Sequence, residues 1–91
     1  MRIFWSAAAQ ADLGRIHKFI AQYDVEAAAL ILNELIDAPE ALLEFPRRGP
    51  RLSDFNPREV RELRVRKYVL RYELVGSDIR VSRCFHGRED R

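Results

Sequence analysis

Arginine is the residue type whose number and placement most clearly predict chemistry in this chain. Residues 46–91 hold thirteen basic and seven acidic side chains, a net charge of +6, whereas residues 1–45 hold three basic and seven acidic ones, a net charge of −4. A guanidinium group can grip a carboxylate or a phosphate with two parallel hydrogen bonds. The second half is therefore expected to meet an anionic partner, either a nucleic acid or an acidic protein segment. The alternative is a solvated arginine-rich surface.

Four arginines fall in segments predicted as strands or their ends: Arg64, Arg66, Arg71 and Arg83. Charged side chains in strands commonly pair across the sheet, and three acidic residues are available as partners, namely Glu62, Glu73 and Asp78. These arginines are expected either to pair within the sheet or to contact a binding partner.

Other reactive residue types are few. The chain has two histidines and one cysteine, with no CxxC motif, so no structural metal site, internal disulfide or cofactor is expected. A single cysteine fits a reducing cytoplasm, and Cys84 is predicted to be a small hydrophobic residue in a strand. His17 is predicted at the surface of a helix. His86 is expected either to bond backbone at the end of the last strand or to transfer a proton.

The first half of the chain predicts a short strand and two helices. Residues 2–5 are rich in strand formers, and Ser6 is a suitable helix cap. One helix is then predicted from an apolar stripe made by Leu13, Ile16, Ile20 and Tyr23. Asp12, Arg15 and Lys18 fall off this stripe and are expected to face water. Asp24 is predicted to cap a second, alanine-rich helix that packs antiparallel on the first. Pro39 predicts a kink or a new turn.

The second half predicts a loop and three strands. Residues 46–58 contain three prolines and a glycine, which favours an extended loop anchored by Leu52 and Phe55. Apolar residues then alternate around Leu63 and Val65, from Tyr68 to Val75, and from Ile79 to Phe85, with a turn at 76–78. The expected fold class is α+β, a single domain over 1–91 with an antiparallel sheet and a helix hairpin on one face. No signal peptide or membrane span is expected, so we predict a cytoplasmic protein.

Several motifs, taken in order, resemble those of the RelE/ParE toxin superfamily, in particular its ParE branch. The first helix carries Ala11-Asp12-Leu13 after Trp5-Ser6. Later come Phe45-Pro46 with Gly49, then Arg61-Glu62-Leu63, Tyr68 with Tyr72, and a final stretch His86-Gly87-Arg88-Glu89-Asp90. The resemblance spans nearly the whole chain. It implies the toxin of a type II toxin–antitoxin pair, held inactive by a cognate ParD-like antitoxin in a hetero-oligomer.

Two activities are associated with this superfamily, and a shared fold cannot decide between them. ParE-like members poison DNA gyrase by stalling its cleaved-DNA intermediate. RelE-like members cleave messenger RNA on the ribosome, which needs a general base, a general acid and cations for the developing phosphorane charge. For that alternative the candidate catalytic residues are Arg64, Arg83 and His86. Val69 stands where the RelE pattern has a cation, and the sequence given ends before the late RelE tyrosine, so the resemblance favours a non-enzymatic gyrase inhibitor.

The resemblance also implies two contact surfaces. A gyrase inhibitor needs a surface that binds one conformational state of its target more tightly than others. The basic second half supplies the predicted target-binding residues: Arg83, His86, Arg88 and Arg91. An acidic antitoxin segment is expected to lie on the helix hairpin and to add a strand to an open sheet edge. The predicted antitoxin-binding residues are Leu13, Ile16, Ile20, Arg64, Arg66 and Arg71. Direct contact with nucleic acid is left open.

Overall fold

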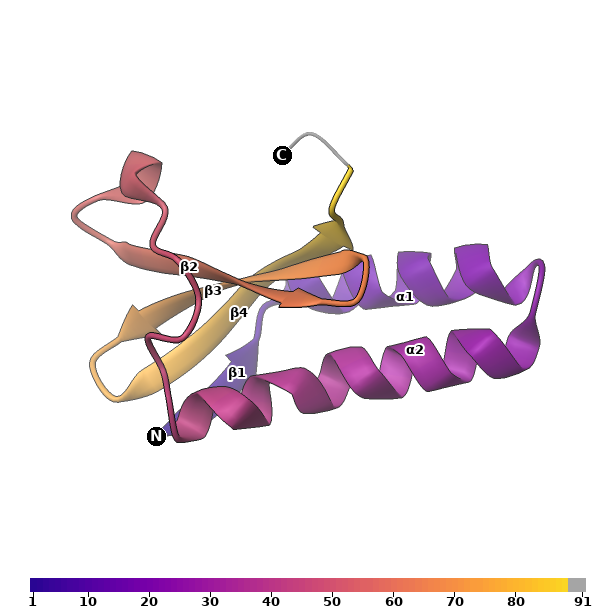
Figure 1. The fold of residues 1–91 in the computed structure, drawn as a ribbon, viewed down its shortest axis with the longest axis horizontal. Helices are drawn as coiled ribbons and strands as arrows, with labels where there is room; N and C mark the ends of the chain where they lie inside the picture. The colour runs from indigo at the N-terminus through magenta and orange to yellow at the C-terminus, as the bar shows by residue number, and fades with distance from the viewer. Residues whose placement is uncertain (89–91) are drawn as a thin grey trace.

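A computed structural model describes residues 1–88 of the chain, as an α+β fold (Figure 1). Strand β1 (Arg2–Trp5) leads into helix α1 (Ala7–Ala21), and helix α2 (Val25–Asp37) returns alongside it. Strands β2 (Glu59–Val65), β3 (Tyr68–Val75) and β4 (Asp78–His86) then form an antiparallel meander. The predicted element order and fold class are confirmed.

The two helices form a hairpin that projects beyond the end of the sheet (Figure 1). The predicted caps are present: the Ser6 hydroxyl accepts from the Ala9 amide at 2.9 Å, and the Asp24 carboxylate accepts from the Ala27 amide at 3.0 Å. Pro39 interrupts the α-helical hydrogen bonding as predicted, and the chain continues as a 3₁₀ helix over Ala38–Leu43.

The sheet has the order β1-β4-β3-β2, with β1 parallel to β4. The sequence predicts an antiparallel sheet, and this parallel pair is a departure from it. β1 pairs only with the first half of β4, from Asp78 to Val81. The last strand of the chain therefore lies inside the sheet, between the first strand and the meander.

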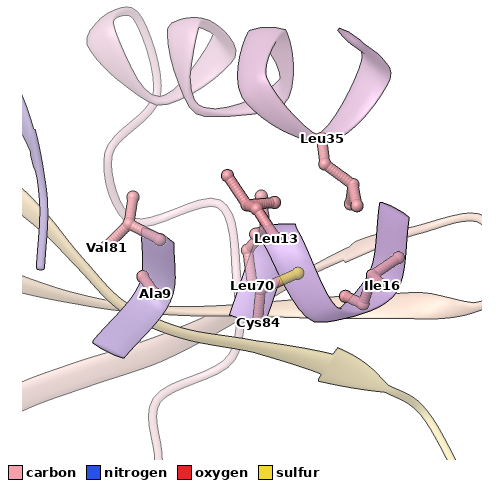
Figure 2. Packing of buried hydrophobic residues seen from close by; sticks show 7 residues of the cluster. All are labelled: Ala9, Leu13, Ile16, Leu35, Leu70, Val81 and Cys84. Carbon is pink, nitrogen blue, oxygen red and sulfur yellow. The ribbon is translucent and has the colours of Figure 1, made fainter. Parts of the chain in front are cut away.

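The main core fills the space between the helix hairpin and one face of the sheet (Figure 2). Helix α1 contributes Ala9, Leu13 and Ile16, and Leu35 points toward them from α2. The sheet contributes Leu70, Val81 and Cys84, all with 1% or less of their surface exposed. Cys84 is thus the small buried hydrophobic residue that its position predicts.

Beyond β1, the cap residue Ser6 and the Asp12 side chain of α1 complete the free edge of β4. The Ser6 amide donates to the Val81 carbonyl at 2.9 Å, and the Ser6 hydroxyl donates to the Ser82 carbonyl. The Asp12 carboxylate accepts from the Cys84 amide at 2.9 Å. Asp12 is only 5% exposed, so the prediction that it faces water is wrong. A buried strand amide needs an acceptor, and the carboxylate takes the place of a neighbouring strand.

Candidate functional site

A cationic cavity lies where the β2–β3 turn meets the end of β4. Its volume is about 320 Å³, and its lining consists of Arg64, Arg66, Lys67, His86, Gly87 and Arg88. Every one of these residues except glycine has a basic side chain, and no carboxylate lines the cavity within residues 1–88. Such a lining favours an anionic ligand.

Backbone geometry holds the two sides of this cavity together. Arg66 adopts a left-handed conformation, with φ of 55°, and so closes the tight turn between β2 and β3. The Gly87 amide donates to the Lys67 carbonyl at 2.7 Å, which ties the end of β4 to that turn. Tyr68 and His86 are cross-strand partners, and their rings meet edge to face with centroids 5.5 Å apart. The turn between β2 and β3 and the end of β4 are therefore held side by side by backbone and ring contacts.

Gly87 leaves the space that the Arg64 guanidinium occupies. A Cβ atom on residue 87 would lie 2.7 Å from Nη1 of Arg64 and 3.2 Å from the Lys67 carbonyl oxygen. Neither Arg64 nor Lys67 has an ion-pair partner among the residues that the structure describes. Both cations therefore line the cavity without a contacting carboxylate from residues 1–88.

Arg66 differs from Arg64 because it is already paired. Its guanidinium makes a two-point ion pair with Glu34 of α2, with Nη2 donating to Oε1 at 2.8 Å. The hydrogen bond from Arg66 holds the pKa of the half-buried Glu34 carboxyl below its ordinary value; burial opposes this effect, and the charge of Arg66 adds to it. Arg66 thus joins the sheet turn to the helix hairpin.

Arg83 lies outside the cavity lining, because its guanidinium is engaged with α1. Nε donates to Asp12 Oδ2 at 2.8 Å and Nη2 donates to Oδ1 at 3.1 Å. Burial opposes ionisation of Asp12, but hydrogen bonds from Arg83 and the Cys84 amide and the charges of Arg83 and Arg15 outweigh it, so the pKa of Asp12 is lowered. This pair fastens α1 to β4.

Arg71 is held within the outer face of the sheet, the face opposite the helices. Its guanidinium lies 5.2 Å from the ring centroid of Phe55 and 5.2 Å from that of Phe85, and it donates to Glu62 at 2.9 Å. Phe55 belongs to the loop over 46–58, so this contact is the loop anchor that the sequence predicts. A groove of about 590 Å³ runs over this face and shares Arg64 and Gly87 with the cationic cavity.

The Phe45-Pro46 and Gly49 motif has a structural explanation. The buried Tyr72 hydroxyl donates to the Pro46 carbonyl at 2.9 Å and accepts from the Gly49 amide at 3.1 Å. Gly49 lies so close to β2 that a Cβ there would be 2.0 Å from the Glu62 carbonyl oxygen. Arg61 donates to the Gly49 carbonyl at 2.7 Å. Burial, the largest influence, raises the pKa of Tyr72, so the phenol stays protonated as a donor.

An apolar groove of about 670 Å³ lies between β1 and the helix hairpin. Ile3, Phe4 and Trp5 line it from the strand, and Leu13, Leu32 and Ile36 line it from the two helices. Phe4 and Ile36 keep 42% and 44% of their surface exposed. Exposed apolar side chains gathered in one groove are typical of a protein-binding surface.

Comparison with known proteins decides the family. The family model described as "ParE toxin of type II toxin-antitoxin system, parDE" matches residues 3–91. The chain belongs to the ParE toxin family. It is therefore the toxin component of a type II toxin–antitoxin system, which implies an antitoxin partner.

Named relatives of this ParE-family toxin carry the other branch's name. Toxin RelE1 of Caulobacter vibrioides is 33% identical over 90 residues, which cover 94% of this chain and 92% of the relative. Toxin RelE2 of the same organism is 33% identical over 85 residues, covering 93% of each. A solved structure, titled "Chromosomal ParDE TA system from P. aeruginosa", matches the fold with a TM-score of 0.77 at 20% identity, covering 94% of this chain and 95% of that one.

The toxin's predicted target-binding residues are only partly brought together. His86 and Arg88 line the cationic cavity, and the Arg88 amide donates to Nδ1 of His86 at 3.1 Å. Arg83 is instead paired with Asp12, and Arg91 lies outside the described residues. Of the alternative catalytic set, Arg64 and His86 share the cavity and Arg83 does not line it.

Two cavity residues were not predicted from the sequence, namely Lys67 and Gly87. Lys67 belongs to the two-residue link between the strand patterns, where a turn places it opposite the end of β4. Gly87 follows the last strand directly and is the one lining residue without a side chain. A glycine after a strand that ends in a histidine, with a basic turn nearby in the meander, is the signal that could have indicated both.

The predicted antitoxin-binding residues of the toxin fall into two groups. Leu13 and Ile16 are core residues, and Ile20 packs against that core from its edge; Leu13 also lines the apolar groove. Arg66 and Arg71 have the internal partners Glu34 and Glu62, whereas Arg64 faces the cavity. Antitoxin contact through these residues stays a prediction, and the groove beside Leu13 offers an apolar surface for it.

Residues 1–88 contain neither a metal-binding cluster nor a membrane-spanning helix. Across residues 1–88, no three side chains of histidine, cysteine, aspartate or glutamate gather where they could hold a metal ion. Within the same range, neither helix combines the length and the apolar character needed to cross a bilayer.

Proposed function

We propose that this ParE-family toxin inhibits DNA gyrase in the cytoplasm by trapping its cleaved-DNA complex, and that a ParD-like antitoxin neutralises it. The family match over residues 3–91 is the observation that carries the proposal. An inhibitor of this kind needs a surface that prefers one state of its target, and the cationic cavity is the candidate surface. His86 and Arg88 from the predicted target-binding set lie there, beside Arg64 and Lys67.

The arrangement of the arginines also supports inhibition over RNA cleavage. Cleavage of a ribose phosphate needs a base, an acid and cations converging on one reacting group. Arg83 is held by Asp12 instead of lining the cavity with Arg64 and His86. His86 already accepts a hydrogen bond at Nδ1 and packs edge to face on Tyr68.

A direct test uses toxin released from its antitoxin, purified gyrase, ATP and supercoiled plasmid, followed by a denaturing step. Linear DNA that forms only with active toxin is the expected result, and added antitoxin should abolish it. The double variant Arg64→Gln/Arg88→Gln should lose the effect. Arg48→Gln is the matched control, because Arg48 is exposed outside the cavity and has no recorded ion-pair partner among the described residues. Supercoiling untouched by a folded toxin that kills cells would refute the proposal.

The second candidate function is ribosome-dependent cleavage of messenger RNA. Two observations favour it: the relatives at 33% identity are named RelE1 and RelE2, and Arg64 and His86 line one cavity. Translating ribosomes with a defined message would show new RNA ends if this candidate is correct. Loss of those ends in His86→Ala, with Arg48→Gln unchanged, would assign the cleavage to the cavity.

A further inference from the structure

We propose that the C-terminal half of α1 is the contact surface for a second copy of this chain, in a two-fold pair of antiparallel α1 helices that cross at Phe19. The surface consists of Arg15, Phe19 and Tyr23 and the pocket beside them, and we call it the aromatic face. The inference concerns self-association and does not depend on which target the toxin acts on.

The aromatic face is a part of the first helix and its following turn that the core does not use. The sequence places Tyr23 on the apolar stripe of Leu13 and Ile16, but Tyr23 keeps 78% of its surface exposed, so this end of the stripe does not face the core. Phe19 is 62% exposed, and its ring meets that of Tyr23 edge to face with centroids 5.7 Å apart. Figure 1 shows this end of the hairpin projecting beyond the sheet.

A pocket of about 380 Å³ adjoins the exposed rings. It is lined by Arg15, Ile16, Phe19, Tyr68 and His86, so Phe19 belongs both to the exposed ring pair and to the pocket. A two-fold interface uses the same patch on both copies, and therefore needs a patch that is complementary to itself. An exposed aromatic side chain next to a pocket meets this requirement, and aromatic residues in pockets commonly dominate binding energy. His86 also lines the cationic cavity, so pairing would cover one side of that histidine.

The spacing along α1 fits an antiparallel pair. Arg15 and Tyr23 lie four residues before and after Phe19, a separation that puts side chains on one side of a helix. The ring contact between Phe19 and Tyr23 shows that this side continues into the turn after α1. A two-fold axis beside Phe19 therefore brings Tyr23 of each copy to Arg15 of the other. Arg15 lies 3.5 Å from Asp12 and keeps 49% of its side chain exposed, which leaves a face of the guanidinium for a tyrosine ring.

Charge is complementary in the same arrangement. This half of α1 carries the basic residues Arg15 and Lys18, and the acidic residues Asp24 and Glu26 follow at the tip of the hairpin. Antiparallel pairing places the acidic tip of each copy beside the basic segment of the other. Parallel pairing would instead place like charges side by side, which opposes association. Both the spacing and the charges therefore select the antiparallel pair.

The first test measures self-association of full-length toxin, released from its antitoxin, by sedimentation equilibrium over a concentration series. We expect monomer and dimer in equilibrium with a Kd of about 10–100 μM, because the contact is small. Phe19→Lys and Tyr23→Lys should each raise this Kd about tenfold or more. Phe45→Lys is the matched control, since Phe45 is 60% exposed but follows the 3₁₀ helix, and it should change the Kd less than about twofold. Thermal melting confirms that each variant is folded.

The second test locates the two-fold axis by cross-linking. In Phe19→Cys the two thiols of a pair lie together at the axis, so a short bismaleimide should link the two copies. In Tyr23→Cys the two thiols lie about 12 Å apart along the helices, four residues from the axis on each side, and should link far less. The native Cys84 is buried and should contribute little background.

Four results would overturn the inference. The first is a toxin that stays monomeric over the whole concentration series. The second is an equal loss in Phe19→Lys and Phe45→Lys, or equal cross-linking of Phe19→Cys and Tyr23→Cys. Self-association that persists in Phe19→Lys but is lost in Ile36→Glu would assign the contact to the apolar groove. Unchanged self-association in Phe19→Lys, with antitoxin affinity about tenfold weaker, would assign the aromatic face to the antitoxin.

Discussion

At the scale of single residues, close backbone contacts explain why Gly49 occurs in a loop otherwise rich in charge. Its Cβ would lie 2.0 Å from a backbone oxygen of β2, which cannot rotate away as a side chain can. Gly49→Ala should therefore lower the free energy of unfolding by about 2–3 kcal/mol, the usual cost of overpacking. Gly14→Ala in α1 is the control, since a Cβ added there would have no neighbour within 4 Å. It should raise the free energy of unfolding by about 0.5–1 kcal/mol, because alanine is more favourable than glycine within a helix. Urea denaturation measures both, and equal effects would contradict the explanation.

Asp12 provides a second prediction at this scale, about pH. Its folded pKa is below its unfolded value, so the ionised carboxylate stabilises the fold above about pH 4 and this contribution disappears as pH falls through the folded pKa. At pH 7, Asp12→Asn should cost about 2 kcal/mol, the value of hydrogen bonds to a buried charge. The difference from the unchanged toxin should shrink below about pH 4. A difference that stays constant down to pH 3 would show that charge is irrelevant there.

The control for Asp12 is Asp37→Asn, at the exposed end of α2. Asp37 has no recorded partner within the described residues, and its replacement should change stability by less than about 0.5 kcal/mol at either pH. Denaturant melts over a pH series, with the slope checked for constancy, measure both variants under the same conditions.

At the scale of elements, the apolar groove between β1 and the helix hairpin predicts where the antitoxin docks. Ile36 and Leu43 are similarly exposed, at 44% and 46% of their surface, but only Ile36 lines the groove, so Leu43 serves as the control. Ile36→Glu places a charge in the proposed interface and should weaken antitoxin binding about tenfold or more. Leu43→Glu should change it less than about twofold. Calorimetry with a purified ParD-like antitoxin measures the affinities, and similar losses in both variants would place the interface elsewhere.

The helices and the meander could be predicted from the sequence because their signals are local. The three-to-four spacing of Leu13 and Ile16, the caps at Ser6 and Asp24, and the alternation from Tyr68 to Val75 each lie within one segment. The parallel pairing of β1 with β4 could not be predicted, since no local pattern joins residues more than seventy positions apart. A short strand carries no information on its direction relative to a distant neighbour.

The candidate site could be predicted in part, for a related reason. His86 and Arg88 follow the last strand directly, so the basic character of that end was visible. The ion pair between Arg83 and Asp12 could not be predicted from the sequence, because Asp12 looks like a surface residue on a helical projection. A strand edge that lacks a neighbouring strand creates the need for that carboxylate, and such an edge exists only in three dimensions.

At the scale of the whole molecule, internal ion pairs join the acidic first half of the chain to its basic second half. Asp12 pairs with Arg83, and Glu34 pairs with Arg66. Part of the charge asymmetry is therefore used in ion pairs within the fold, and only the charged side chains outside those pairs are available to partners. The cationic cavity and the exposed apolar groove share no lining residue.

Partner binding should contribute much of this toxin's stability. A chain of 91 residues buries a modest core, and its apolar groove stays open without a partner. Antitoxin at a hundred times its Kd adds about 2.7 kcal/mol, which for a domain of this size raises Tm by roughly 10–20 °C. Differential scanning fluorimetry of the toxin with and without antitoxin measures this shift. A Tm that does not change on complex formation would contradict the assignment of the groove as an interface.

The inner position of β4 has a consequence for how the protein is made. Its first residue, Asp78, follows the end of β1 by 73 residues, which takes about 4–15 s at ordinary rates of synthesis. During that interval β1 and the helix hairpin have no sheet to cover their apolar faces. A nascent chain interrupted before β4 lacks the strand that joins both edges, and it also lacks Arg83, Cys84, His86 and Gly87. We therefore expect a chain interrupted there to lack both the closed core and the cationic cavity, and to expose the apolar faces of β1 and the helix hairpin until β4 is made.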